Sequence, residues 1–110
     1  MRKTELKINL SNLIYNIEVI KRFTKADIQA VVKANSYGLS ASEVAKTIND
    51  YVESFSVITL DEAIELRKHT DKPILLLQGV HEIDDYQIVQ EQCFDFVVHS
   101  NWQLENITNF

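Results

Sequence analysis

The chain has 110 residues, 45% hydrophobic and 25% charged, which suits one small domain or part of a larger one and argues against disorder. Its formal net charge of −5 lacks the basic footprint of a nucleic-acid-binding protein, so we expect no nucleic-acid partner. Its single cysteine, Cys93, excludes an intrachain disulfide, and with three separated histidines it matches no zinc spacing, so we expect no metal site.

The first predicted elements are a strand and a helix. Leu6, Ile8 and Leu10 alternate with polar residues, as in a half-exposed strand. Apolar residues then recur at three- and four-residue steps, which predicts an amphipathic helix. They are Leu10, Leu13, Ile14, Ile17, Ile20 and Phe23. Asn9 or Ser11 is expected to cap the start of this helix.

Four short apolar runs follow, rich in β-branched or aromatic residues, as expected of strands covered on both faces. The runs cover residues 28–32, 55–58, 74–77 and 94–98. After three of them, a hydroxyl residue is followed three positions later by Glu or Gln, which is the capping-box signature of a helix start. The three pairs are Ser40 with Glu43, Thr59 with Glu62, and Ser100 with Gln103.

The alternation of strand and helix predicts an α/β fold with a parallel sheet and right-handed crossovers. An open doubly wound sheet and a (β/α)8 TIM barrel both satisfy this pattern. Four strands are about half of a barrel that typically needs ~250 residues, and the chain ends at Phe110 inside the helix that Ser100 opens. We therefore expect a partial (β/α)8 TIM barrel in a truncated chain, with roughly the first four β/α units and a preceding N-terminal strand and helix.

The sequence contains no segment that predicts secretion or membrane insertion. Its longest apolar runs, such as residues 74–77, are far too short to cross a bilayer. The N-terminus has no long apolar stretch before cleavable small residues. We expect a cytoplasmic protein without a membrane partner.

Lys33 is the first candidate for chemistry. It directly follows Ala30, Val31 and Val32, so it lies at the carboxyl end of a predicted strand, where barrels build their active sites. Alternation along the strand places Lys33 on the same face as Val31. A partly desolvated lysine amine can attack an aldehyde. Position alone also fits a lysine that extends from the strand end into water.

The segment Val32-Lys33-Ala34-Asn35-Ser36-Tyr37-Gly38 resembles the lysine segment of alanine racemases, which use pyridoxal 5'-phosphate (PLP). Similar stretches follow the family's order along the whole chain. They are Leu10-Ser11-Asn12-Leu13 with Asn16, Thr59-Leu60-Asp61-Glu62-Ala63 with Leu66-Arg67, and Pro73-Ile74-Leu75-Leu76-Leu77 with Gly79. Two departures lie near the lysine. Ser36 replaces the more usual Ala or Gly, and Leu39-Ser40 replaces a common His-Gly pair.

The resemblance implies that residues 1–110 are the N-terminal portion of an alanine racemase-like PLP-binding barrel domain. It implies that Lys33 holds PLP as a Schiff base and acts as one of two catalytic bases, while Tyr37 hydrogen-bonds the cofactor phosphate. The implied activity interconverts L-alanine and D-alanine for peptidoglycan precursor supply, in a homodimer when the chain is full length. The second base and the partner of the pyridine nitrogen come from later in the family's chain, so this piece alone is expected to be inactive.

Two other interpretations stay open. Another barrel PLP enzyme, such as an amino-acid decarboxylase or a broad-specificity racemase, has a similar lysine at a strand end. Tyr37-Gly38 and the N-terminal helix favour the racemase. In the other interpretation the chain is a non-catalytic α/β module and Lys33 is a surface charge.

Overall fold

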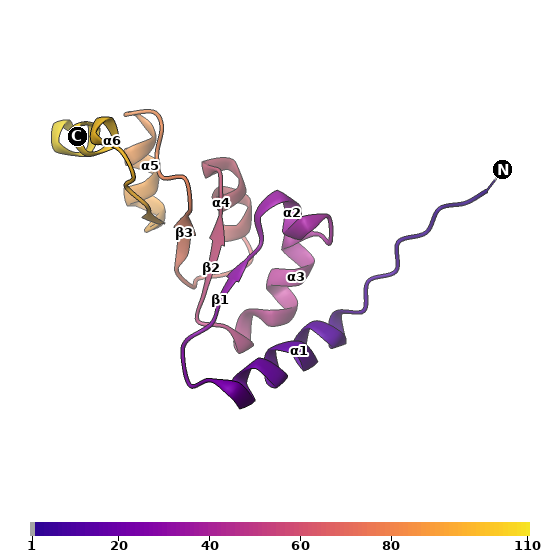
Figure 1. Ribbon diagram of the computed structural model, residues 1–110. Helices are drawn as coiled ribbons and strands as arrows, with labels where there is room; N and C mark the ends of the chain where they lie inside the picture. The colour runs from indigo at the N-terminus through magenta and orange to yellow at the C-terminus, as the bar shows by residue number, and fades with distance from the viewer. Residues whose placement is uncertain (1) are drawn as a thin grey trace.

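The structure is a computed structural model that describes residues 2–110 (Figure 1). Its elements are α1 (Leu10–Phe23), β1 (Gln29–Val31), α2 (Lys33–Tyr37), α3 (Ala41–Ile48), the 3-10 helix η1 (Asn49–Tyr51), β2 (Ser54–Val57), α4 (Leu60–Arg67), β3 (Ile74–Leu76), α5 (Asp85–Gln92), β4 (Asp95–Phe96) and α6 (Asn101–Asn109). Within these residues, no helix is both long and apolar enough to span a bilayer.

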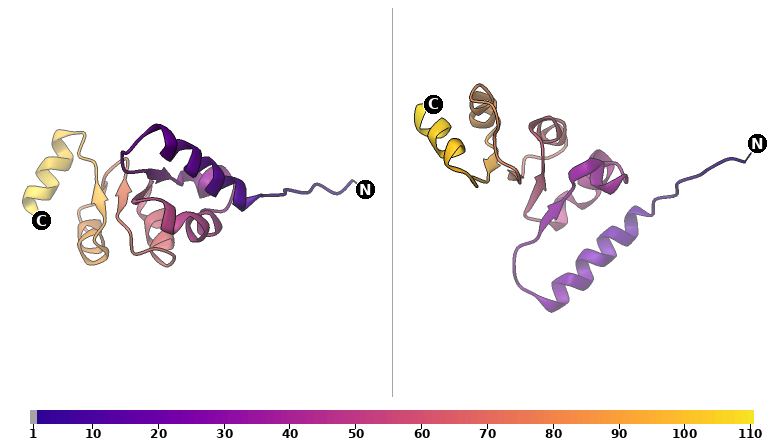
Figure 2. Two further views of the ribbon diagram at one scale, coloured as in Figure 1. Left: turned by 90° about the horizontal axis from the view of Figure 1, so that it is seen from below. Right: turned by 45° about the horizontal axis from the view of Figure 1, so that its top comes forward.

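The four strands form one parallel sheet in the order β1-β2-β3-β4. Ala30 lies opposite Phe55, Phe55 opposite Ile74, and Leu75 opposite Asp95. Helices α3, α4 and α5 lie along one side of the sheet (Figure 2). A doubly wound sheet would reverse its strand order and carry helices on both faces. The fold is therefore a partial (β/α)8 barrel, which confirms the predicted architecture.

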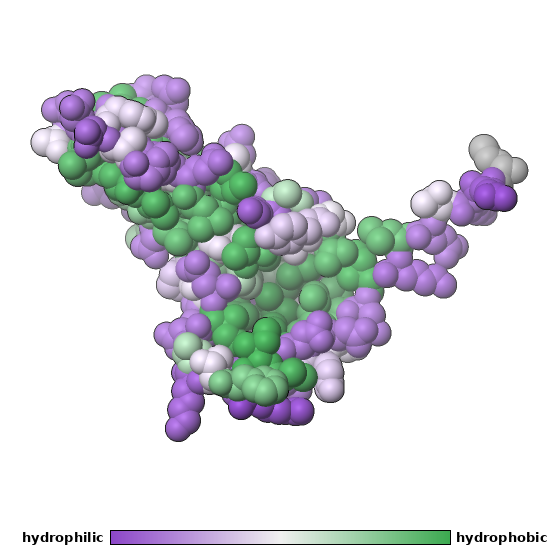
Figure 3. Space-filling view, viewed as in Figure 1, coloured by the Kyte–Doolittle hydropathy of each residue, from purple (hydrophilic) through white to green (hydrophobic). Residues whose placement is uncertain are grey.

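The core lies between the sheet and these helices. Phe55, Val57, Ile74 and Leu76 are at most 1% exposed. The helix residues buried with them are Val44, Ala45 and Ile48 of α3, Ala63 and Leu66 of α4, and Tyr86 and Val89 of α5. Because side chains alternate along a strand, Val31 belongs to the other face, and it is 40% exposed. Apolar side chains gather across the middle of the view in Figure 3.

The N-terminal prediction was right for the helix and wrong for the strand. Asn9 caps α1, with its Oδ1 accepting the Asn12 N–H at 3.3 Å. Residues 2–9 form no strand, and they run away from the rest of the molecule (Figure 1). The reason is that the alternation around Leu6 and Ile8 needs a neighbouring strand to complete its hydrogen bonds, and residues 2–110 provide none there.

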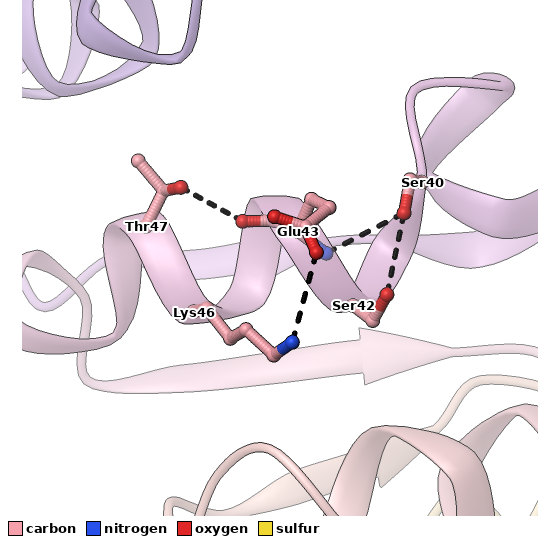
Figure 4. Close-up of polar contacts among 5 residues, drawn as sticks. All are labelled: Ser40, Ser42, Glu43, Lys46 and Thr47. Carbon is pink, nitrogen blue, oxygen red and sulfur yellow. Dashed lines mark hydrogen bonds and ion pairs between the residues drawn. The ribbon is translucent and has the colours of Figure 1, made fainter.

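The three predicted capping boxes have three different outcomes. Thr59 and Glu62 form the complete reciprocal box at the start of α4. Ser40 accepts the Glu43 N–H at 3.5 Å, while the Glu43 carboxylate pairs with Lys46 at 3.6 Å (Figure 4). Ser100 makes no side-chain cap bond at the start of α6.

Candidate functional site

The candidate site begins where β1 ends. Val32 is 2% exposed, and its N–H donates to the Ser56 carbonyl at 2.9 Å, which extends the β1–β2 pairing by one residue. Lys33 follows, half-buried. Among residues 2–110 its ammonium has no hydrogen-bond or ion-pair partner. The pairing of β1 with β2 therefore fixes the backbone beside an amine that is free to react.

The backbone after Lys33 makes one turn of a left-handed helix. Ala34, Asn35, Ser36 and Tyr37 have φ values of 51°, 54°, 56° and 56°, and Gly38 follows at 88°. This conformation costs roughly 1–2 kcal/mol for most residues other than glycine, and asparagine adopts it more readily than the rest. Four such residues in succession persist only where the surroundings hold them, and strain of this kind concentrates at functional sites.

Several hydrogen bonds hold the left-handed turn. Within it, the Ser36 N–H donates to the Val32 carbonyl at 2.9 Å and the Gly38 N–H donates to the Ala34 carbonyl at 3.2 Å. The Asn35 Oδ1 accepts the Ala41 N–H at 2.9 Å, which joins the turn to α3. The Ala34 N–H donates to Glu62 Oε2 at 2.7 Å, which joins it to α4.

Lys33 and Tyr37, the two site residues predicted from the sequence, lie at the two ends of this turn. Tyr37 is 64% exposed, and its hydroxyl has no hydrogen-bond partner among residues 2–110. The pair thus offers an amine that can take up an aldehyde and a phenol that can donate to a phosphate oxygen. The amine and the phenol fit PLP, which carries an aldehyde and a phosphate.

Glu62 is the site residue that sequence reasoning missed, because its capping pattern predicted only a local role. Its Oε1 accepts the N–H groups of Ile58 and Thr59 at 3.1 and 3.0 Å and the Thr59 hydroxyl at 3.2 Å. Partial burial acts to raise the pKa of this carboxyl, but the hydrogen bonds from Thr59, Ala34 and Ile58 outweigh it and leave the pKa below its ordinary value.

Gln103 makes a related bridge between the carboxyl ends of β3 and β4. It is 1% exposed, and its Oε1 accepts the His99 N–H at 2.8 Å. Its Nε2 donates to the Gln78 carbonyl at 3.0 Å. His99 Nε2 lies 3.0 Å from the same carbonyl, so His99 takes part in this bridge.

A cleft of about 370 Å³ lies beside the turn, between α3 and α4. Its lining includes Asn35 and Glu62 but neither Lys33 nor Tyr37. Val57 and Leu66, which also line it, belong to the helix-covered side of the sheet. The cleft is therefore separate from the lysine site.

A parallel β/α sheet with the candidate lysine at the carboxyl end of a strand is the arrangement of a barrel protein whose site lies at the usual barrel end. The family model described as "Alanine racemase, N-terminal domain" matches residues 8–110. The chain belongs to the alanine racemase family, as an N-terminal domain of these isomerases.

Curated relatives agree with this assignment. The chain is 38% identical over 106 residues to alanine racemase of Neisseria meningitidis, covering 96% of this chain and 30% of the relative. It is 38% identical over 108 residues to alanine racemase of Pseudomonas entomophila, covering 97% and 30%. The chain thus spans about a third of the length of the curated relatives it matches.

Solved structures show the same fold. Biosynthetic alanine racemase from Pseudomonas aeruginosa superposes with a TM-score of 0.85 at 35% identity, covering 91% of this chain and 28% of that one. The Acinetobacter baumannii alanine racemase gives 0.86 at 29% identity, covering 93% and 31%. The Bartonella henselae alanine racemase, described with covalently bound pyridoxal phosphate, gives 0.82 at 23% identity, covering 93% and 29%.

Proposed function

We propose that this chain is the N-terminal part of a PLP-dependent alanine racemase in which Lys33 is the point of cofactor attachment. The carrying observation is the half-buried, unpartnered Lys33 at the end of β1, joined by a left-handed turn to the exposed Tyr37. Family membership and a relative described with covalently bound pyridoxal phosphate support the choice of cofactor. Because the chain spans about 30% of its relatives, the proposed activity is that of the full-length enzyme.

When bound, PLP supplies the electron sink that stabilises a carbanion at the substrate Cα. Lys33 Nζ would hold the cofactor and would move a proton at Cα on one side of alanine. Tyr37 donates a hydrogen bond to the cofactor phosphate. Racemisation also needs a base on the opposite side, which we assign to a residue outside these 110.

In the cell, we propose a homodimer that acts on alanine and supplies D-alanine for peptidoglycan precursors. We place the enzyme in the cytoplasm. Cys93 is exposed and unpaired, which suits a reducing compartment. These proposals concern the full-length enzyme and are based on the family to which the chain belongs.

Borohydride reduction of the PLP-loaded full-length protein tests the cofactor site. We expect mass spectrometry to find the cofactor on the peptide that contains Lys33. Lys33→Ala should abolish both the label and racemisation, whereas Lys25→Ala, which removes an exposed lysine before β1, should keep both. Cofactor found on another lysine would refute the assignment.

Two further measurements refine the proposal. Tyr37→Phe should mainly weaken cofactor retention, by roughly 1 kcal/mol, because it removes one phosphate hydrogen bond and leaves Lys33 in place. A panel of amino acids tests the substrate. Faster racemisation of another amino acid would indicate a broad-specificity racemase, release of carbon dioxide a decarboxylase, and failure to take up PLP a non-catalytic module.

A further inference from the structure

We propose that Glu62 is a positioning residue that holds Lys33 in place through the backbone of the left-handed turn. This inference rests on the proposed role of Lys33 as the cofactor lysine. Glu62 does not touch that lysine directly. Its Oε2 accepts the N–H of Ala34, the residue that follows Lys33, at 2.7 Å across 28 residues of sequence.

The bridge acts at the first strained residue of the turn. Ala34 has φ 51° and ψ 48°, a conformation that alanine avoids when it is unconstrained. The other hydrogen bonds of the turn come from neighbours at most six residues away, such as Asn35 to Ala41. Glu62 is the charged group that acts on the turn from another β/α unit, and hydrogen bonds to a charged acceptor are the stronger kind.

The two carboxylate oxygens of Glu62 accept hydrogen bonds from different segments of the chain. Oε1 takes the local N–H groups of Ile58 and Thr59 and the Thr59 hydroxyl, while Oε2 takes Ala34 alone. Both partner sets are donors, so only a side chain with two acceptor oxygens satisfies them at once. Glu62 therefore ties the ends of β1 and β2 together as one unit.

Gln103 makes a similar bridge, but its far atom donates a hydrogen bond where that of Glu62 accepts one. Glu62 and Gln103 are both the third residue of the helix that follows a strand, α4 and α6 respectively. Each side chain binds the start of its own helix with one atom. With the other atom it binds the loop after the neighbouring strand, which is β1 for Glu62 and β3 for Gln103. Gln103 reaches carbonyl oxygens with its Nε2, whereas Glu62 reaches an N–H. In each case the far atom of the side chain matches the group it meets.

Glu62→Gln is the discriminating variant. It keeps the size of the side chain and the acceptor for Ile58 and Thr59, but it turns an NH2 group toward the Ala34 N–H. Two donors then face each other, so the cap of α4 survives and the bridge is lost. Thr59→Ala is the matched control, because it weakens the same cap and leaves the Ala34 bridge. Gln103→Glu is a second control at the equivalent position of α6, where the side chain reaches the loop after β3.

The test uses the full-length protein and two readouts. Hydrogen–deuterium exchange of the cofactor-free protein, resolved to the Ala34 amide, should be about tenfold faster or more in Glu62→Gln, since a bond to a charged acceptor is lost. It should be unchanged in Thr59→Ala and Gln103→Glu. The yield of cofactor on Lys33 after borohydride reduction at limiting PLP should fall several-fold in Glu62→Gln only.

Each result decides between separate claims. Unchanged exchange at Ala34 in Glu62→Gln would overturn the bridge. Faster exchange with an unchanged Lys33 yield would overturn the positioning role, and so would an equal loss of yield in Thr59→Ala, because stability alone would then explain it. Wild-type protein that carries PLP on another lysine would refute the proposed function and this inference with it, while Ala34 exchange would still report the bridge.

Discussion

Gly79 and Gln103 meet at the carboxyl ends of β3 and β4, where a Cβ on Gly79 would come within 2.7 Å of Gln103 Nε2. It would come closer still to the Val97 carbonyl oxygen. Gly79 also has φ +75°, which side chains rarely adopt. The space and the backbone both require glycine here, because Gln103 occupies the place that a methyl group would take.

Gly79→Ala should therefore destabilise the protein by roughly 2–4 kcal/mol, from the left-handed conformation and the overpacking together. Gly38→Ala is the matched control. Gly38 has φ +88°, but a Cβ there meets nothing within 4 Å, so we expect a loss of only about 1 kcal/mol. Denaturant unfolding of both variants checks this prediction, and equal losses would contradict the steric part of it.

Ser40 combines a strained backbone with a cap. Its φ is +71°, and its Oγ accepts the Glu43 N–H and lies 3.3 Å from Ser42 Oγ (Figure 4). Ser40→Gly relieves the strain and loses little of the cap, whereas Ser40→Ala loses the cap and keeps the strain. The glycine variant should be the more stable by roughly 1 kcal/mol or more in thermal unfolding. The reverse order, usual for helical positions, would show that the strain is not present.

The capping box of α4 should be energetically important, unlike the start of α6. Thr59→Ala removes a hydroxyl that accepts the Glu62 N–H at 3.2 Å, and the expected loss is about 1 kcal/mol. Ser100→Ala removes a buried hydroxyl without a partner in residues 2–110, so its effect should lie within about 0.5 kcal/mol of zero. A larger effect at Ser100 would mean that α6 is capped in solution.

The lowered pKa of Glu62 predicts a pH dependence of stability. Its carboxylate is favoured in the folded chain, so its stabilisation is complete above the ordinary value of about 4.5 and is lost as the pH falls through the lower folded pKa. The difference in Tm between wild type and Glu62→Gln should be constant near neutral pH and shrink below about pH 4.5. The pKa of Glu65 is also lowered, by the hydrogen bond from Lys68. Glu65 is present in both proteins, so its contribution cancels in the Tm difference. A Tm difference that grows on acidification would contradict this prediction.

The 110-residue chain by itself should associate. Among the described residues, β1 and β4 each pair on one side only, which leaves unpaired N–H and C=O groups at both edges. Val31, Val98 and Leu104 are also 40%, 42% and 57% exposed. Size-exclusion chromatography with light scattering should find dimers or larger species. A monomer with a melting midpoint independent of concentration would contradict this expectation.

The four strands, helix α1 and their order in the chain follow from the sequence alone. Apolar runs bounded by turn residues identified β1 to β4, and the three- and four-residue steps from Leu10 identified α1, because both patterns depend on periodicity within one segment. The Thr59 and Glu62 pair predicted the start of α4 for the same reason. Lys33 and Tyr37 were identified by their resemblance to the family segment.

The way in which the strand ends are joined follows from the packing of the whole chain and not from local sequence. The sequence from Ala34 to Tyr37 does not predict four left-handed residues, since none of them is glycine and only Asn35 adopts that conformation readily. The absence of a strand at Leu6 and Ile8 depends on the lack of a neighbour. The reach of Glu62 to Ala34 and of Gln103 to the Gln78 carbonyl joins segments more than 20 residues apart. Such contacts exist only once the parallel pairing has brought the carboxyl ends of the strands side by side.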